Sequence, residues 1–126
     1  MKLNENKLVI TVDGKGYPPV FTNNGWALDI LAPQDLYLER GKEFCIESGL
    51  TISMPRNMKG SILSKLKGEF SINKGEVIHP EFTGQLELAL KYIGHSSDRI
   101  PAGTPICQLV LSPVFKAEDY MDIQIG

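Results

Sequence analysis

The stretch QLELALKY, residues 85–92, decides between a helical and a β-rich fold for this chain. Leu, Glu, Ala and Lys all favour helix, so intrinsic propensity alone would accept a helix here. A segment this short is not stable as an independent helix, however, and FTG and GHSS bound it on its two sides. Its apolar residues alternate with polar ones, as in a half-buried strand, and we therefore predict a strand over 85–92.

Similar alternating segments recur between turn signals along the whole chain. They are KLVITV (7–12), FCIES (44–48), LTISM (50–54), SILSKL (61–66) and ICQLVL (106–111). This spacing, with 12 glycines and 8 prolines distributed over 126 residues, is typical of an all-β sandwich or barrel. No repeat, linker or low-complexity tract marks a domain boundary, so we predict one all-β domain over residues 1–126. The stretch FKAEDYMDIQIG (115–126) alternates weakly and predicts an edge strand that pairs within the fold or with a neighbouring subunit.

Charge and composition exclude several classes of protein. A formal net charge of −2, with charged residues scattered singly, provides neither a basic face for nucleic acid nor a polybasic membrane patch. No apolar run approaches the roughly 20 residues needed to cross a bilayer, and MKLNENKLVITV lacks the apolar core of a signal peptide. Cys45 and Cys107 lie in apolar runs, which predicts buried, reduced thiols. We expect a soluble, cytoplasmic protein that binds neither nucleic acid nor membrane.

Asp29 is the acid in an otherwise apolar segment, NGWALDILAP (24–33). Burying a carboxylate without a partner costs several kcal/mol, so such a residue is usually paired or functional. Asp29 either caps a turn at the end of a strand or serves as a ligand for a metal ion or water near a phosphate chain. Both roles stay open on the sequence alone.

A second polar group ends the segment GLTISMPRNMKGSILSKLKG (49–68). Ser64 offers a directed hydrogen bond and Lys65 a point charge, both of which suit phosphate oxygens. A solvated polar strand face would have the same composition. In IPAGTPICQLVLSPV (100–114), Gln108 is the only strongly polar side chain of a strand, and a buried amide needs partners. Gln108 therefore either ties down a neighbouring loop or faces a ligand.

The stretch GEVIHPEFTGQL (75–86) predicts a tight hairpin with a proline and a glycine at its turn. The ring of Phe82 would lie against a sugar or base, or else belong to the core. Backbone amides near Val77 and His79 would read the edge of a base. His79 itself is a titrating group, a donor to phosphate or a simple turn residue.

In this order, the four stretches resemble motifs of the trimeric deoxyuridine triphosphate nucleotidohydrolase (dUTPase) superfamily, which also contains the dCTP deaminases. WALDI is similar to the first motif, AGxDL, with Asp29 at the acid that helps to hold magnesium with the nucleotide. VIHPEFTGQL resembles the third motif, VIDxDYRGE, and IPAGTPICQLVL the fourth, with Gln108 at its glutamine. The resemblance implies a single-domain, jelly-roll-type β-barrel, a homotrimer, and nucleotide sites between subunits. Compact genes of this family are common in viruses and phages.

The departures from the motifs bear on catalysis. In the second motif, PRSG, Lys65 stands at the arginine and Leu66 at the serine, which keeps the charge but loses the bidentate fork. In the third motif, His79 replaces the water-activating aspartate and Phe82 the sugar-stacking tyrosine. In a phosphate-rich pocket a histidine tends toward its cationic form, which makes it a poorer base than a carboxylate.

These observations lead to three hypotheses, of which the first is favoured by the sequence. The first is a nucleotide-binding protein with little or no hydrolysis, a sponge, sensor or regulator. The second is an active, Mg²⁺-dependent dUTP diphosphatase in which Asp29 positions magnesium and His79 or Glu81 orients the attacking water. The third is an interaction module that binds no nucleotide. Under the first hypothesis the ligand-binding residues are Ser64, Lys65, Val77, His79, Phe82 and Gln108.

Overall fold

Strands alone make up the regular structure of the described residues in the computed structural model, which are 7–22, 25–66, 70–72, 77–92, 98–114 and 121–126. No helix among them is long and apolar enough to cross a membrane. The strands are β1 (Val9–Val12), β2 (Val20–Thr22), β3 (Ala27–Leu31), β4 (Leu36–Leu38), β5 (Glu43–Ser53), β6 (Met58–Ser64), β7 (Phe70–Ile72), β8 (Val77–Ile78), β9 (Thr83–Tyr92), β10 (Asp98–Ile100) and β11 (Pro105–Pro113).

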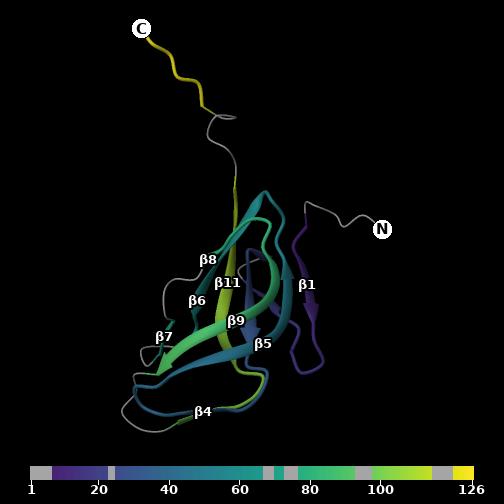
Figure 1. The fold of residues 1–126 in the computed structure, drawn as a ribbon, viewed down its shortest axis with the longest axis vertical. Coiled ribbons are helices and arrows are strands. Elements are labelled where there is room, and N and C mark those ends of the chain that lie inside the picture. The colour runs from purple at the N-terminus through teal and green to yellow at the C-terminus, as the bar shows by residue number, and fades with distance from the viewer. Residues whose placement is uncertain (1–6, 23–24, 67–69, 73–76, 93–97, 115–120) are drawn as a thin grey trace.

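These strands form two main sheets that pack face to face. A four-stranded sheet has the order β1-β5-β9-β7, and a five-stranded sheet has the order β2-β3-β11-β6-β8. A third pair, β10-β4, lies near one end. In Figure 1 the long strands β5 and β9 cross in front of β6 and β11. The predicted all-β, jelly-roll-type architecture is confirmed.

Alternation along β9 shows how the sequence builds the core between the sheets. Leu86, Leu88 and Leu90 are buried, while Glu87 between them is exposed and Ala89 is half-buried. This period of two places every second side chain in the core and confirms the strand predicted over 85–92. Most of the other buried apolar residues that meet them come from β3, β5, β6 and β11, including Ile30, Ile46, Ile52, Ile62, Ile106 and Leu109.

The sequence predicts two separate strands over 44–48 and 50–54, and this is wrong. Both segments belong mainly to the one long strand β5, whose register with β9 shifts between Glu47 and Thr51. The hydroxyl of Ser48, fully buried in this bulge, donates to Leu86 O over 2.7 Å and accepts from Leu50 N over 3.1 Å. The SGL segment, whose residues are typical of a turn, thus forms a β-bulge inside one long strand. The Ser48 side chain supplies hydrogen bonds where the backbone pairing of β5 with β9 is interrupted.

Three other expectations are corrected. The predicted hairpin over 75–86 has its turn, but its two arms lie in different sheets, since β8 pairs with β6 and β9 pairs with β5 and β7. Residues 121–126 form no strand with the rest of this fold and extend away from the sheets (Figure 1), while 115–120 lie outside the described residues, and pairing with a neighbouring subunit stays a prediction. Cys107 is buried as predicted, but Cys45 is exposed because it points to the outer face of β5 opposite Ala89.

Replacement of Ser48 by alanine tests the bulge. The change leaves the buried Leu86 O and Leu50 N without their side-chain partner, so the free energy of unfolding should fall by about 1–3 kcal/mol. Urea unfolding of the purified variant measures this. Ser53→Ala, in the same strand but half-buried, is the matched control and should change stability much less. Equal effects of the two changes would contradict the role assigned to Ser48.

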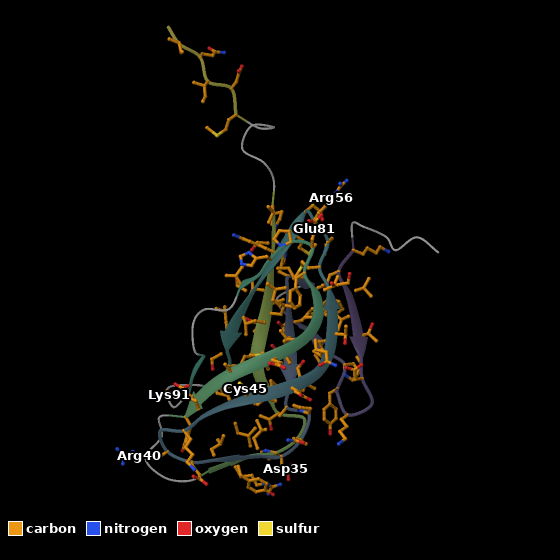
Figure 2. The ribbon with its side chains drawn as sticks, viewed as in Figure 1. Asp35, Arg40, Cys45, Arg56, Glu81 and Lys91 are labelled. Carbon is orange, nitrogen blue, oxygen red and sulfur yellow. The ribbon has the colours of Figure 1, made fainter. Side chains whose placement is uncertain are left out.

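A carboxylate at the end of the molecule holds the turn that leads into β11. Asp35 accepts a hydrogen bond from Ala102 N at 2.8 Å and one from Arg99 Nη2 at 2.9 Å. The backbone donor, helped by the guanidinium, lowers the pKa of Asp35 below its ordinary value of 3.8. Figure 2 shows Asp35 at the end of the molecule opposite Glu81 and Arg56.

The stabilisation by Asp35 should depend on pH in a defined direction. Because the pKa is lowered in the folded state, the stabilisation is complete above the unfolded value and is lost as the pH falls through the folded one. The melting temperature of the wild type should therefore exceed that of Asp35→Asn near neutral pH, and the two should converge in strong acid. A difference that persists unchanged in acid would contradict this assignment.

Candidate functional site

A first group of candidate residues lies on the outer face of the five-stranded sheet. Antiparallel pairing places Asp29 of β3 opposite Gln108 of β11, and Gln108 opposite Leu63 of β6. Cross-strand partners point to the same face of a sheet. Lys65 follows Leu63 by two residues, so its side chain leaves on that face as well. The register of three strands thus brings Asp29, Lys65 and Gln108 into one group.

Lys65 forms an ion pair with Asp29. Its Nζ donates to Asp29 Oδ2 over 2.7 Å, and because β11 lies between β3 and β6, the lysine side chain crosses β11 to reach the carboxylate. Only 11% of the Asp29 side chain is exposed, against 36% for Lys65, which places the ammonium on the solvent side of the pair. The sequence predicts that this carboxylate is paired or functional, and the structure shows the pair.

The second carboxylate oxygen of Asp29 is buried and has no hydrogen-bond partner among the described residues. A buried acceptor left in this state costs about 1–3 kcal/mol, and more when it is charged. A water molecule or a ligand donor at Oδ1 would remove this cost.

Gln108 is tied to its own protomer. Its Nε2 donates to the hydroxyl of Thr22 over 2.9 Å, which joins β11 to the edge strand β2 across β3. Of the two roles open for the amide, the described contacts show the tie to a neighbouring segment. Thr22 was not singled out from the sequence, although it is the hydroxyl-bearing residue of the strand VFT.

Ser64 closes the turn after β6. Its hydroxyl accepts from Leu66 N over 3.2 Å and donates to Leu66 O over 3.3 Å. Lys65 N donates to Ile106 O over 3.1 Å, which fixes the backbone at the base of the lysine. Ser64 therefore orients the chain around Lys65 and uses its hydroxyl locally.

A second group of candidate residues forms the turn between β8 and β9. Phe82 N donates to His79 O over 3.2 Å, which closes a four-residue turn with Pro80 at its second position. Glu81 has φ of 67°, a left-handed conformation that is uncommon for residues other than glycine. Strained backbone of this kind tends to persist where a side chain has a function. Glu81 is exposed and lies at the same end of the molecule as Arg56 (Figure 2).

The ring of Phe82 is held over a glycine beside a free strand edge. A Cβ added to Gly84, whose φ is 151°, would lie 3.4 Å from Phe82 Cζ, at van der Waals contact, so the ring lies directly against this glycine. Phe82 is 38% exposed and Val77 is 45% exposed. β8 is the outermost strand of its sheet, and among the described residues no strand pairs with its outer edge. Main-chain groups on that edge and an aromatic face are suited to a planar polar ligand.

The two groups lie far apart within one protomer. Val77 pairs with Ser61 of β6, two residues from Leu63, and three strand steps separate β8 from β3. At about 4.8 Å per strand and 3.4 Å per residue, Asp29 and His79 are on the order of 20 Å apart. A single protomer therefore does not assemble all the predicted site residues in one place.

A cleft of about 860 Å³ lies elsewhere, between the β1–β2 turn, the segment before β4 and the β5 bulge. Residues lining it include Asp13, Lys15, Asp35, Glu47 and Gln85, and none of the predicted site residues. No group of three or more His, Cys, Asp or Glu residues suited to a metal ion occurs in the described parts of the chain. The cleft and the predicted site residues are thus separate places in the fold.

The two packed sheets, the ion-paired acid on an outer sheet face and the aromatic turn beside a strand edge define a protein of the dUTPase-like, jelly-roll class. The dUTPase family model matches residues 21–124. The chain belongs to the dUTPase family.

Sequence relatives agree with this assignment, and solved structures agree with the fold. A deoxyuridine 5'-triphosphate nucleotidohydrolase of Ehrlichia canis is 30% identical over 93% of this chain and 76% of its own length, and one of Clostridium tetani is 23% identical over 87% and 79%. A point mutant of the dUTPase of Staphylococcus bacteriophage 80alpha superposes with a TM-score of 0.76 at 18% identity, covering 96% of both chains. A point mutant of the dUTPase of the S. aureus phage phi11, described with a structural Mg(II) ion, gives 0.75 at 16% identity, covering 96% and 97%.

Loss of the Lys65 charge should destabilise the fold through Asp29. In Lys65→Met the mostly buried carboxylate loses its partner, and the free energy of unfolding should fall by about 1–3 kcal/mol. The double variant Lys65→Met/Asp29→Asn should recover part of this loss, because the uncompensated charge is gone. Denaturant unfolding of the single and double variants measures the coupling. Strictly additive effects would contradict the ion pair.

Proposed function

We propose that this protein is a dUTP diphosphatase, which converts dUTP and water to dUMP and pyrophosphate. The observation that carries the proposal is the register of β3, β11 and β6, which gathers Asp29, Gln108 and Lys65 on one sheet face. Relatives named as deoxyuridine triphosphate nucleotidohydrolases support this activity better than the non-hydrolytic function favoured by the sequence. Another mutant of the phage 80alpha dUTPase, with 18% identity to this chain, is described with dUpNHpp.

We propose further that the working unit is a homotrimer with its sites between protomers. The separation of Asp29 from His79 in one chain supports this, because a second copy can supply the missing half of each site. The outer face that carries Asp29 also exposes apolar residues, with Val20 at 51%, Leu63 at 52% and Val77 at 45%. Apolar patches of this kind on a sheet face mark interaction surfaces.

In this proposal each group has a separate task. Phe82 packs against the sugar or base while the outer edge of β8 reads the polar edge of the base. Lys65 meets the phosphate oxygens as a point charge. Glu81 or His79 orients a water molecule, whose oxygen attacks phosphorus as the bond to the pyrophosphate leaving group breaks, and the released proton passes to that side chain. A cytoplasmic location fits this substrate and the free thiols Cys45 and Cys107.

The magnesium ion implied by the family does not fit the residues at Asp29. One carboxylate oxygen is held by Lys65 at 2.7 Å, and the other has no exposed surface. Mg²⁺ requires near-octahedral oxygen ligation and keeps several of its waters. Asp29 thus supplies no open carboxylate oxygen to a hydrated ion, and no step of the proposed reaction is assigned to one.

A second candidate function is nucleotide binding without hydrolysis. It is favoured by His79, which stands where the family has its water-activating aspartate, and by the ion pair that engages Asp29. Loss of a general base typically slows a reaction by about 10²- to 10⁴-fold. The protein would then hold the nucleotide as a sponge, sensor or regulator.

Pyrophosphate release from dUTP, dTTP and dCTP by the purified protein separates the two functions. Turnover that prefers dUTP, and that falls by about 10²-fold or more in Glu81→Gln, supports the diphosphatase with Glu81 as base. Glu87→Gln, an exposed carboxylate on the outer face of β9, is the matched control and should leave the rate unchanged.

His79→Asp completes this test. If the rest of the site is intact, restoring a carboxylate should raise the rate of pyrophosphate release by about 10²- to 10⁴-fold. A thermal shift with dUTP but no turnover in the wild type would favour binding without hydrolysis. Absence of both turnover and thermal shift with every nucleotide would refute both functions.

A further inference from the structure

We infer that the Lys65 ammonium takes the place of a divalent cation at Asp29, so that this protein binds nucleotide phosphates without a metal ion. The inference rests on the proposed nucleotide site. It starts from the contact between Lys65 Nζ and Asp29 Oδ2, which at 2.7 Å is a direct charged hydrogen bond. The carboxylate that would otherwise serve a metal ion already has a cation built into the chain.

Exposure of the pair leaves Lys65 open to a ligand. An ammonium has three N–H donors and no acceptor, and Asp29 Oδ2 accepts one of the three. Lys65 is 36% exposed while Asp29 is 11% exposed, so an approaching phosphate meets the lysine before the carboxylate. The remaining donors suit phosphate oxygens, which accept point-charge contacts from lysine.

The balance of charge favours the same arrangement. A triphosphate brought up to a bare Asp29 would meet a negative group, and a metal ion or a basic side chain has to neutralise it. Lys65 does so before any ligand arrives. A hydrated Mg²⁺ at the same place would be repelled by the ammonium beside it, and it would find Asp29 Oδ1 enclosed. Lys65 and a divalent cation therefore exclude one another at this carboxylate.

The fixed backbone around Lys65 supports this role. Lys65 N is bonded to Ile106 O, and the Ser64 hydroxyl bridges both polar backbone groups of Leu66. The backbone of Lys65 is therefore fixed by hydrogen bonds, and the ammonium at the other end of its side chain is fixed by Asp29. A side chain held at both ends loses less conformational freedom when it contacts a phosphate.

Isothermal titration calorimetry with the non-hydrolysable nucleotide dUpNHpp tests the inference, in excess MgCl₂ and in excess EDTA. For the wild type the dissociation constant should differ by less than about threefold between the two conditions, since neither the site nor its charge depends on the metal. For Lys65→Met binding in EDTA should weaken by about tenfold or more, and Mg²⁺ should restore most of it, because Asp29 is then free to receive the ion.

Two further variants complete the experiment. Lys65→Arg keeps the positive charge and should retain binding in EDTA. Lys42→Met removes an equivalent ammonium, which lies 2.7 Å from Glu39 on the exposed surface, and should behave as the wild type. Wild-type protein that binds dUpNHpp only with Mg²⁺ overturns the inference and leaves the proposed function standing. Wild-type protein that binds dUpNHpp in neither condition overturns the proposed function.

Discussion

The pairing of β11 with β3 on one side and β6 on the other is the constraint on which the rest of the site depends. It fixes which residues of three distant segments share a face, and it places Asp29, Gln108 and Leu63 in one row. The inner face of the same strands carries Ile30 and Leu109 into the core. A slip of one residue in either pairing would exchange these faces, burying polar groups and exposing apolar ones. The core and the site are thus set by the same register.

The Asp29–Lys65 pair changes what the family resemblance implies. A carboxylate in this position of the family helps to hold magnesium, whereas here it holds a lysine. A lysine at a position that commonly carries arginine thus has a consequence beyond the loss of a bidentate fork, since it pairs this carboxylate with a cation of the chain itself. Together with His79, this pair sets the sequence of the chain apart from the motifs it resembles.

Local patterns predicted the strands well, because the period of two is written into each segment. The run 85–92 places Leu86, Leu88 and Leu90 in the core, as its alternation requires. Features that depend on distant segments were beyond the sequence. Nothing in residues 44–54 shows that a buried Ser48 will bridge a bulge to β9, and nothing in the order of residues shows that Cys45 faces outward. Likewise Asp29 and Lys65 are 36 positions apart, and their contact follows only from the strand that lies between them.

The contact between Gly16 and Gly49 couples two parts of the surface that are separate in sequence. A Cβ on Gly16 would lie 2.6 Å from Gly49 O, and one on Gly49 would lie 2.6 Å from Gly16 Cα, so the two main chains touch with no side chain between them. Asp13 N also bonds to Gly49 O over 2.7 Å. A graft of the β1–β2 turn from a homologous protein would therefore fit only if the β5 bulge were transferred with it. The same contact would constrain a circular permutation that cuts the chain at this turn.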